Sequence, residues 1–110
     1  MPVVHVVLMA FEPLATPQEV KKIVQNMLAL KDKCVHPKTQ KPYVKLTKGG
    51  VNLTSDGFAE GYSHSFVMEF ETGEDCAYYS DEDPVHLEFI DSTSGIVSKT
   101  LVVDFTPGVF

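Results

Sequence analysis

Positive charge is scarce in this chain of 110 residues: nine Lys and Arg residues stand against 15 Asp and Glu residues, and the net charge is −6. Nucleic-acid binding requires a basic surface, so the composition argues against that partner. Long apolar runs are lacking too. The apolar start at residues 3–11 is too short to span a membrane, and no basic segment precedes it. We therefore expect a cytoplasmic protein that binds neither nucleic acid nor membrane.

Cysteine is limited to Cys34 and Cys76, and tryptophan is absent. The two cysteines form no C-x-x-C pair, so their spacing supports neither a zinc site nor a thioredoxin-type redox pair. In a reducing compartment both thiols are expected to stay free. The remaining composition, 44% hydrophobic and 22% charged, is ordinary for a globular protein. The length predicts a single domain over residues 1–110.

The most informative stretch for the fold is residues 3–11, which is apolar at nearly every position. A strand that is apolar on both faces must be covered on both faces. In a small domain helices cover one face, and a second copy of the chain is the simplest cover for the other. Another strand is predicted at residues 61–70, where large side chains alternate with smaller or polar ones. The large ones are Tyr62, His64, Phe66, Met68 and Phe70.

Three helices are predicted from their start signals. Residues 16–19 form a capping box with proline at the first helical position, and the helix they open ends before the His-Pro pair at 36–37. A short helix is expected over residues 74–80. Asp83, followed by a proline, opens a third helix, whose apolar stripe is expected to extend as far as residues 96–97.

Two further strands complete the predicted sheet. Residues 43–53 are expected to form an edge strand with a bulge or bend at the glycine pair 49–50, followed by a turn at residues 54–57. Residues 100–105 form the last strand. The apolar tail at residues 109–110 is expected to dock on a partner subunit or across the sheet.

The element order predicts an α+β fold with the ferredoxin-like β-α-β-β-α-α-β topology. In that topology a four-stranded antiparallel sheet carries helices on one face and has its first and third strands in the centre. The bare face, with Val4, Val6 and Leu8 or their alternates, is too apolar for a monomer. We therefore expect a homodimer in which two sheets stack face to face.

Three histidines lie in apolar company, at His5, His64 and His86. If all three face the layer between sheet and helices, they line one cavity, and Tyr78 or Tyr79 reaches its mouth. A neutral imidazole and a phenol are suitable partners for moving a proton at a carbon next to a carbonyl. The competing interpretation is that each histidine only satisfies hydrogen bonds in the core.

A three-histidine zinc site is the weaker interpretation, because antiparallel strands would place His5 and His64 toward opposite ends of the sheet. The fourth histidine, His36, lies before a proline in a polar loop and is expected to be exposed to solvent. We therefore expect no metal and no cofactor.

Four short motifs follow one another over nearly the whole chain. They are Val4-His5-Val6-Val7-Leu8 with Phe11, Gly61-Tyr62-Ser63-His64 with the strand up to Phe70, Pro84-Val85-His86, and Val102-Val103-Asp104-Phe105. Together they resemble the stress-responsive A/B barrel family, whose members are dimeric α+β barrels of about this size. The resemblance implies the same face-to-face homodimer that the apolar first strand suggests.

The resemblance also implies chemistry, since one plant member of the family is a polyketide cyclase that closes a ring by intramolecular aldol condensation. It implies His86 as the general base, and Tyr79, or else Tyr78, as the partner of the base. The residues expected to contact a small apolar substrate are His5, Val7, Met9, His64, Phe66 and Tyr78.

Three functions remain open at this stage. The first is a cofactor-free lyase or cyclase that acts on a small, largely apolar oxo compound such as a polyketide. The second is a non-catalytic dimer, stress-associated or binding a small ligand, whose histidines serve the core. The third is a monooxygenase of similar dimeric barrel architecture, which would also need no cofactor.

Overall fold

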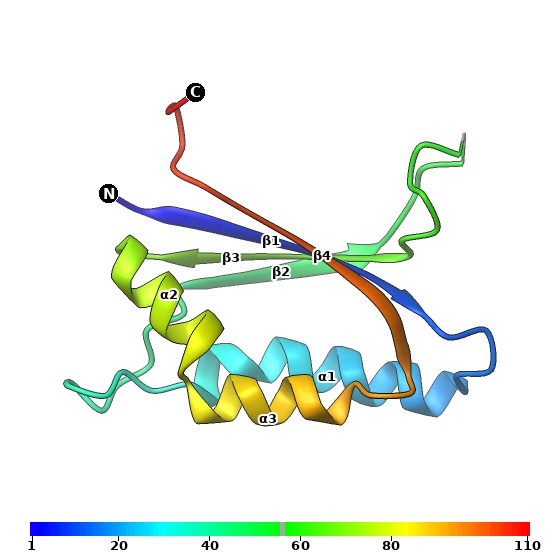
Figure 1. Cartoon of the computed structure of the whole chain (residues 1–110), viewed down its shortest axis with the longest axis horizontal. Helices are drawn as coiled ribbons and strands as arrows, with labels where there is room; N and C mark the ends of the chain where they lie inside the picture. The colour runs from blue at the N-terminus through cyan, green and yellow to red at the C-terminus, as the bar shows by residue number, and fades with distance from the viewer. Residues whose placement is uncertain (56) are drawn as a thin grey trace.

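The computed structural model describes residues 1–55 and 57–110. Its four strands form one antiparallel sheet in the order β2-β3-β1-β4, and its three helices all lie on one face of that sheet (Figure 1). This confirms the predicted ferredoxin-like α+β fold. Each helix is too short or too polar to cross a membrane, over the residues described. The elements are β1 (Val3–Phe11), α1 (Pro17–Lys33), β2 (Leu46–Val51), β3 (His64–Phe70), α2 (Gly73–Asp81), α3 (Pro84–Ser92) and β4 (Val97–Phe105).

Strand β1 lies in the centre of the sheet between β3 and β4, as predicted. Its odd-numbered side chains point to the helices, so His5, Val7 and Met9 are buried. Its even-numbered side chains Val4 and Val6 point to the opposite face and stay partly exposed. The alternation of the strand therefore decides which residues enter the core and which form the bare face of the sheet.

Helix α1 begins at the predicted capping box. The backbone N–H of Glu19 donates to the Thr16 hydroxyl over 3.1 Å, and the backbone N–H of Thr16 donates to the Glu19 carboxylate over 2.9 Å. These bonds satisfy donors that a helix start otherwise leaves free. Ile23, Met27 and Leu30 form the buried stripe that packs under the sheet.

Several element boundaries differ from the prediction. Strand β2 covers only Leu46–Val51, because residues 43–44 are buried in an irregular segment instead of pairing in the sheet. Helix α3 ends at Ser92, and Ile96 and Val97 do not extend its stripe: Gly95 reverses the chain with φ of 80°, and β4 starts at Val97. The turn predicted at residues 54–57 includes Asp56, which lies outside the described residues.

The predicted bulge or bend at Gly49 and Gly50 is wrong. The two glycines pair in continuous register with Phe66 and Ser65 of β3. A Cβ atom added at Gly49 would lie 2.5 Å from Cδ1 of Phe66 and 2.9 Å from the carbonyl oxygen of Ser65, whereas one at Gly50 would meet nothing within 4 Å. Gly49 is therefore needed for space, since the buried ring of Phe66 occupies the volume of its missing side chain.

This contact predicts a sharp difference between two neighbouring substitutions. Gly49→Ala should lower the free energy of unfolding by about 1–3 kcal/mol, because the methyl group must displace a core ring or the β3 backbone. Gly50→Ala is the matched control and should change it by less than about 0.5 kcal/mol. Urea denaturation followed by circular dichroism measures both values. Equal effects of the two substitutions would show that the close contact at Gly49 does not constrain the sheet.

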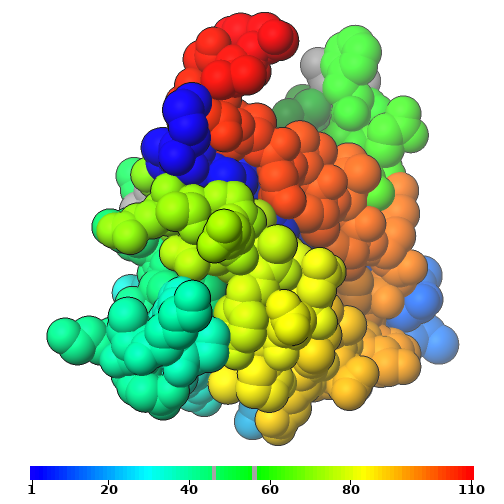
Figure 2. Space-filling view, turned by 60° about the vertical axis from the view of Figure 1, so that its left-hand side comes forward, coloured from blue at the N-terminus to red at the C-terminus, as the bar shows by residue number. Residues whose placement is uncertain are grey.

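The bare face of the sheet is apolar and open. On β4, Leu101, Val103 and Phe105 point to this face, and each retains 43–52% of its accessible surface. The tail beyond β4 rises on the same side, away from the helices (Figures 1 and 2). Val109 and Phe110 are strongly exposed. The tail therefore does not dock across its own sheet, which leaves docking on a partner subunit as the remaining prediction.

Candidate functional site

A cavity of about 470 Å³ lies between the helices and the β1–β4 half of the sheet. Strand β1 contributes His5, Val7 and Met9 to its wall, and the helices contribute Tyr79 and His86. Further lining residues are Met27, Ser80, Phe89, Ile90, Thr93, Thr100, Val102 and Asp104. A cavity of this size, mostly apolar with a few polar groups, is typical of a site for a small organic ligand.

His86 and Tyr79 form a stacked pair in this cavity. Their ring centroids are 4.0 Å apart, with an angle of 24° between the ring planes. Tyr79 is fully buried in α2, and His86 is half-buried in the first turn of α3. Two polar atoms of the pair, Oη of Tyr79 and Nδ1 of His86, are buried without a hydrogen-bond partner among the described residues. Such atoms are costly in a core and are common where a ligand binds.

The environment sets the protonation of both rings. Burial lowers the pKa of His86 and His5 contributes in the same direction, while the backbone of Tyr79 and the carboxylate of Asp83 act against the shift. Burial, with smaller contributions from Cys34 and Asp83, raises the pKa of Tyr79. Near neutral pH the pair therefore consists of a neutral imidazole and a protonated phenol, the forms required of a base and a hydrogen-bond donor.

His5 completes the polar part of the cavity together with Asp104. The two residues face each other across β1 and β4, and Nδ1 of His5 lies 2.5 Å from Oδ1 of Asp104. The His5 ring also contacts Tyr79 edge to face, with centroids 5.6 Å apart. Asp104 was not predicted as a site residue. The alternation of β4, which turns Thr100 and Val102 to the same cavity, is the signal that identifies it.

His64 lies elsewhere, so the expectation that three histidines share one cavity is wrong. In the antiparallel register Met9 pairs with His64, whereas His5 pairs with Met68 nearer the other end of the strands. His64 packs edge to face on Phe11, with centroids 4.9 Å apart. It lines a separate cavity of about 120 Å³, and Phe66 belongs to that cavity as well.

Tyr78 and His36 form a third group, outside the main cavity. Tyr78 packs near Tyr43 and His36, whereas Tyr79 stacks on His86. Tyr79 is therefore the tyrosine that faces the cavity. His36 was expected to be exposed, but it is partly buried because its Nε2 lies 3.2 Å from Asp75 and its ring packs on Tyr43.

Asp83 anchors the start of α3 and so places His86. Its Oδ1 accepts from the backbone N–H groups of Val85 and His86 over 2.9 and 3.5 Å, as predicted for an N-cap. Its other oxygen accepts from the hydroxyl of Tyr43 over 2.5 Å. Burial and this hydrogen bond raise the pKa of Tyr43, and burial beside Asp83 raises that of Cys34 to about 12. The carboxylate is almost fully buried, so it depends on these partners within the protein.

Removing this anchor should destabilise the fold. Asp83→Ala removes a helix cap, worth about 1 kcal/mol, and leaves the Tyr43 hydroxyl without its acceptor, which costs about 1–3 kcal/mol more. Thr16→Ala, which removes an exposed cap from α1, is the control and should cost only about 1 kcal/mol. In urea denaturation, adding Tyr43→Phe to Asp83→Ala should recover part of the loss. Equal effects of the two cap variants would contradict the role of the buried pair.

The fold and the cavity define a class: small ferredoxin-like α+β proteins with a ligand-sized site between the sheet and the helices. The model of the stress responsive A/B barrel domain family matches residues 3–107, and the chain belongs to this family. A curated relative is the stress-response A/B barrel domain-containing protein HS1 of Arabidopsis thaliana. It is 28% identical over 106 residues, which cover 96% of this chain and 90% of HS1.

Solved structures agree with the fold. The hydroxynitrile lyase from Passiflora edulis superposes with a TM-score of 0.82 at 20% identity, over 99% of this chain and 96% of the lyase. A dimeric ferredoxin-like protein of unknown function from Thermobifida fusca superposes with a TM-score of 0.71, also at 20% identity, over 96% of this chain and 90% of that protein. At such identities these likenesses show the shared fold.

Proposed function

We propose that the protein is a cofactor-independent lyase or cyclase that acts on a small, largely apolar oxo compound such as a polyketide. The observation that carries the proposal is the stacked pair of His86 and Tyr79. Both residues belong to the wall of a cavity of about 470 Å³, and each has a buried polar atom without a hydrogen-bond partner among the described residues. A relative in fold, the Passiflora enzyme, is a hydroxynitrile lyase, which supports chemistry at a carbon that bears oxygen.

In the proposed reaction His86 removes a proton from a carbon next to a carbonyl group. Tyr79 donates its phenolic hydrogen bond to the carbonyl oxygen and stabilises the enolate that forms. In the cyclase direction the enolate carbon attacks a second carbonyl of the same substrate, a carbon–carbon bond forms, and the new alkoxide takes the proton that His86 removed. His5, oriented by Asp104, serves as a further polarising donor. The proton equivalents balance, and no oxidant or reductant is consumed.

A non-catalytic dimer that binds a small ligand is the alternative. Tyr79 favours it, because this side chain is fully buried and packs on Phe70 and His5 as a core residue would. In that case the cavity accepts an oxo compound without converting it. The two free, buried cysteines are compatible with the proposed cytoplasmic location in either case.

The proposal is tested by incubating the protein with two kinds of substrate, a linear poly-β-oxo thioester and an aromatic β-hydroxy ketone, and analysing products by mass spectrometry. We expect cyclisation or cleavage well above the rate in buffer. Val102→Trp, which fills the cavity from β4, should abolish it, and Leu14→Trp on an exposed loop should not. If both substrates stay intact while one of them binds and Val102→Trp prevents its binding, the alternative function is correct.

We also propose that the protein is a homodimer joined through the bare face of the sheet. An open apolar face of this kind is unfavourable in water. Leu101, Val103 and Phe105 of β4 lie there beside Val6 of β1. The Thermobifida fusca protein with the same fold is described as dimeric. A twofold axis through this face would bury the patch of each copy against that of the other.

A further inference from the structure

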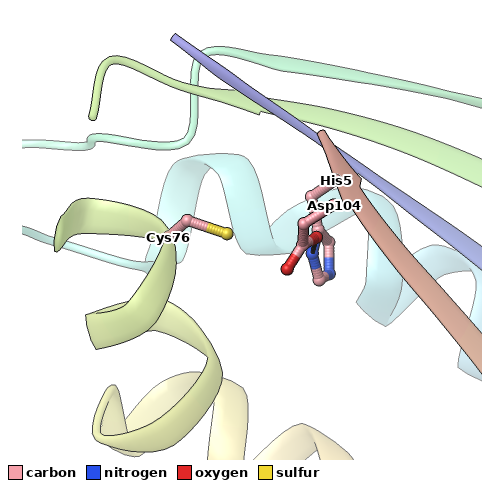
Figure 3. Close-up of side chains that lie close together, drawn as sticks. All are labelled: His5, Cys76 and Asp104. Atoms are coloured by element: carbon pink, nitrogen blue, oxygen red, sulfur yellow. Dashed lines mark hydrogen bonds and ion pairs between the residues drawn. The ribbon is translucent and has the colours of Figure 1, made fainter. Parts of the chain in front are cut away.

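The side chains of His5, Cys76 and Asp104 form a cluster, although the three residues are far apart in the sequence. Each is of a type that can bind a metal ion. They come from β1, α2 and β4, and one ligand atom of each lies within 4.8 Å of the others. In Figure 3 the sulfur of Cys76 points toward the carboxylate and the imidazole. We propose that this cluster binds one divalent transition-metal ion of the Zn²⁺ type. This proposal does not rest on the proposed reaction.

The donor set determines the class of ion. A thiolate and an imidazole select borderline or soft ions such as Zn²⁺ and Co²⁺, whereas Mg²⁺ and Ca²⁺ prefer sites made of oxygen only. Three protein ligands are also the number found in zinc sites that keep a fourth position open. Binding would form a bond from the ion to the sulfur of Cys76 and release the thiol proton to solvent.

The surroundings suit an ion that enters from solvent. His5 and Cys76 are 3% and 5% exposed, so two of the ligands are fixed by packing. The side chain of Asp104 is 42% exposed to solvent. Cys76 and Asp104 line a second, open cavity of about 520 Å³, while His5 and Asp104 line the main one. The cluster therefore stands between two cavities, which provide an access route and space for a water molecule at the open position.

The ligand atoms must shift to bind one ion together, because they lie within 4.8 Å of one another and not at a single tetrahedral spacing. Nδ1 of His5 and Oδ1 of Asp104 are 2.5 Å apart, whereas two ligands of a tetrahedral ion with bonds of about 2.0 Å lie roughly 3.3 Å apart. Because Asp104 is the exposed member of the cluster, its carboxylate is the group that turns to admit the ion. The bound ion then replaces the hydrogen bond between His5 and Asp104, so the cofactor-independent reaction proposed above belongs to the metal-free form.

Cobalt titration of the full chain, kept reduced, tests the proposal. We expect saturation at one Co²⁺ per chain, a thiolate-to-cobalt charge-transfer band in the near ultraviolet, and displacement by Zn²⁺. Cys76→Ser should abolish the band, and both it and His5→Ala should weaken binding by at least about tenfold. Cys34→Ala and His64→Ala are matched controls that should bind as the unmodified protein does. These residues lie outside the cluster.

Asp104→Asn provides a second variant that keeps the fold, because the replaced side chain is partly exposed and asparagine has nearly the same shape. It should also weaken cobalt binding, with an unchanged circular dichroism spectrum. The proposal is overturned if the protein shows no saturable cobalt binding. It is equally overturned if cobalt binds without the thiolate band, or if Cys76→Ser binds as tightly as Cys34→Ala does.

Discussion

Replacing His86 by alanine is expected to reduce turnover of an oxo substrate by about 10²–10⁴-fold, the usual contribution of a positioned general base. The imidazole is half-buried at the cavity wall, stacked on Tyr79, and its Nδ1 has no partner among the described residues. Alanine is a good helix former, and the backbone of this residue already receives its cap from Asp83, so α3 should remain folded. The measurement is kcat/KM for wild type and variant on the substrate identified for the cavity.

The pH dependence of the rate gives an independent check. A base must be neutral to accept a proton, and burial lowers the pKa of His86. The rate should therefore rise with pH through a midpoint below 6.5, the ordinary value for histidine, and reach a plateau near neutral pH. In the His86→Ala variant this rise of the rate with pH should disappear together with the activity.

His64→Ala is the matched control for the catalytic variant. Its pKa is also lowered by burial, but it lies on β3 in the separate cavity. Removal of the His64 side chain should leave unchanged both the rate and its rise with pH at acidic pH. If His86→Ala retained full turnover, or if His64→Ala lost it, the assignment of the base would be wrong.

Local signals in the sequence were sufficient to predict the main helices and strands. The capping box at residues 16–19 and the cap at Asp83 mark helix starts that the structure confirms, because hydrogen bonds within one turn decide them. The alternation of β1 likewise placed His5, Val7 and Met9 on one face of the strand, and the structure shows that this is the face toward the helices. The local signals did not reveal steric contacts between neighbouring strands. The pair Gly49 and Gly50 was interpreted as a bulge or bend, whereas the ring of Phe66, from another strand, explains the glycine at position 49.

The site was only partly predictable for the same reason. Alternation indicates which face a histidine occupies, and the antiparallel topology already predicted that His5 and His64 lie toward opposite ends of the sheet. The register sets the distance between them, and the pairing of Met9 with His64 places His64 outside the main cavity. Asp104 and Cys76 are separated from His5 by most of the chain. Their approach depends on the β1–β4 pairing and on where α2 packs, which no short motif encodes.

The proposed homodimer predicts a large effect from one charge. Val103→Asp should raise the dissociation constant of the dimer by more than about 10³-fold, so that the variant is a monomer at micromolar concentration. Val103 pairs with Val6 on the bare face and is 52% exposed in the single chain. A twofold interface would bury this carboxylate twice, and each unpaired buried charge costs several kcal/mol. Sedimentation velocity measures the change directly.

Leu14→Asp is the matched control, because it also replaces an apolar residue by a carboxylate. Leu14 is 93% exposed in the loop before α1, away from the sheet. This variant should sediment as the wild type does. Since Val103 is half exposed, Val103→Asp should keep the circular dichroism spectrum of the folded chain, so that loss of the dimer is not loss of the fold. A wild-type protein that sediments as a monomer, or a Val103→Asp variant that remains dimeric, would mean that the bare face is not the interface.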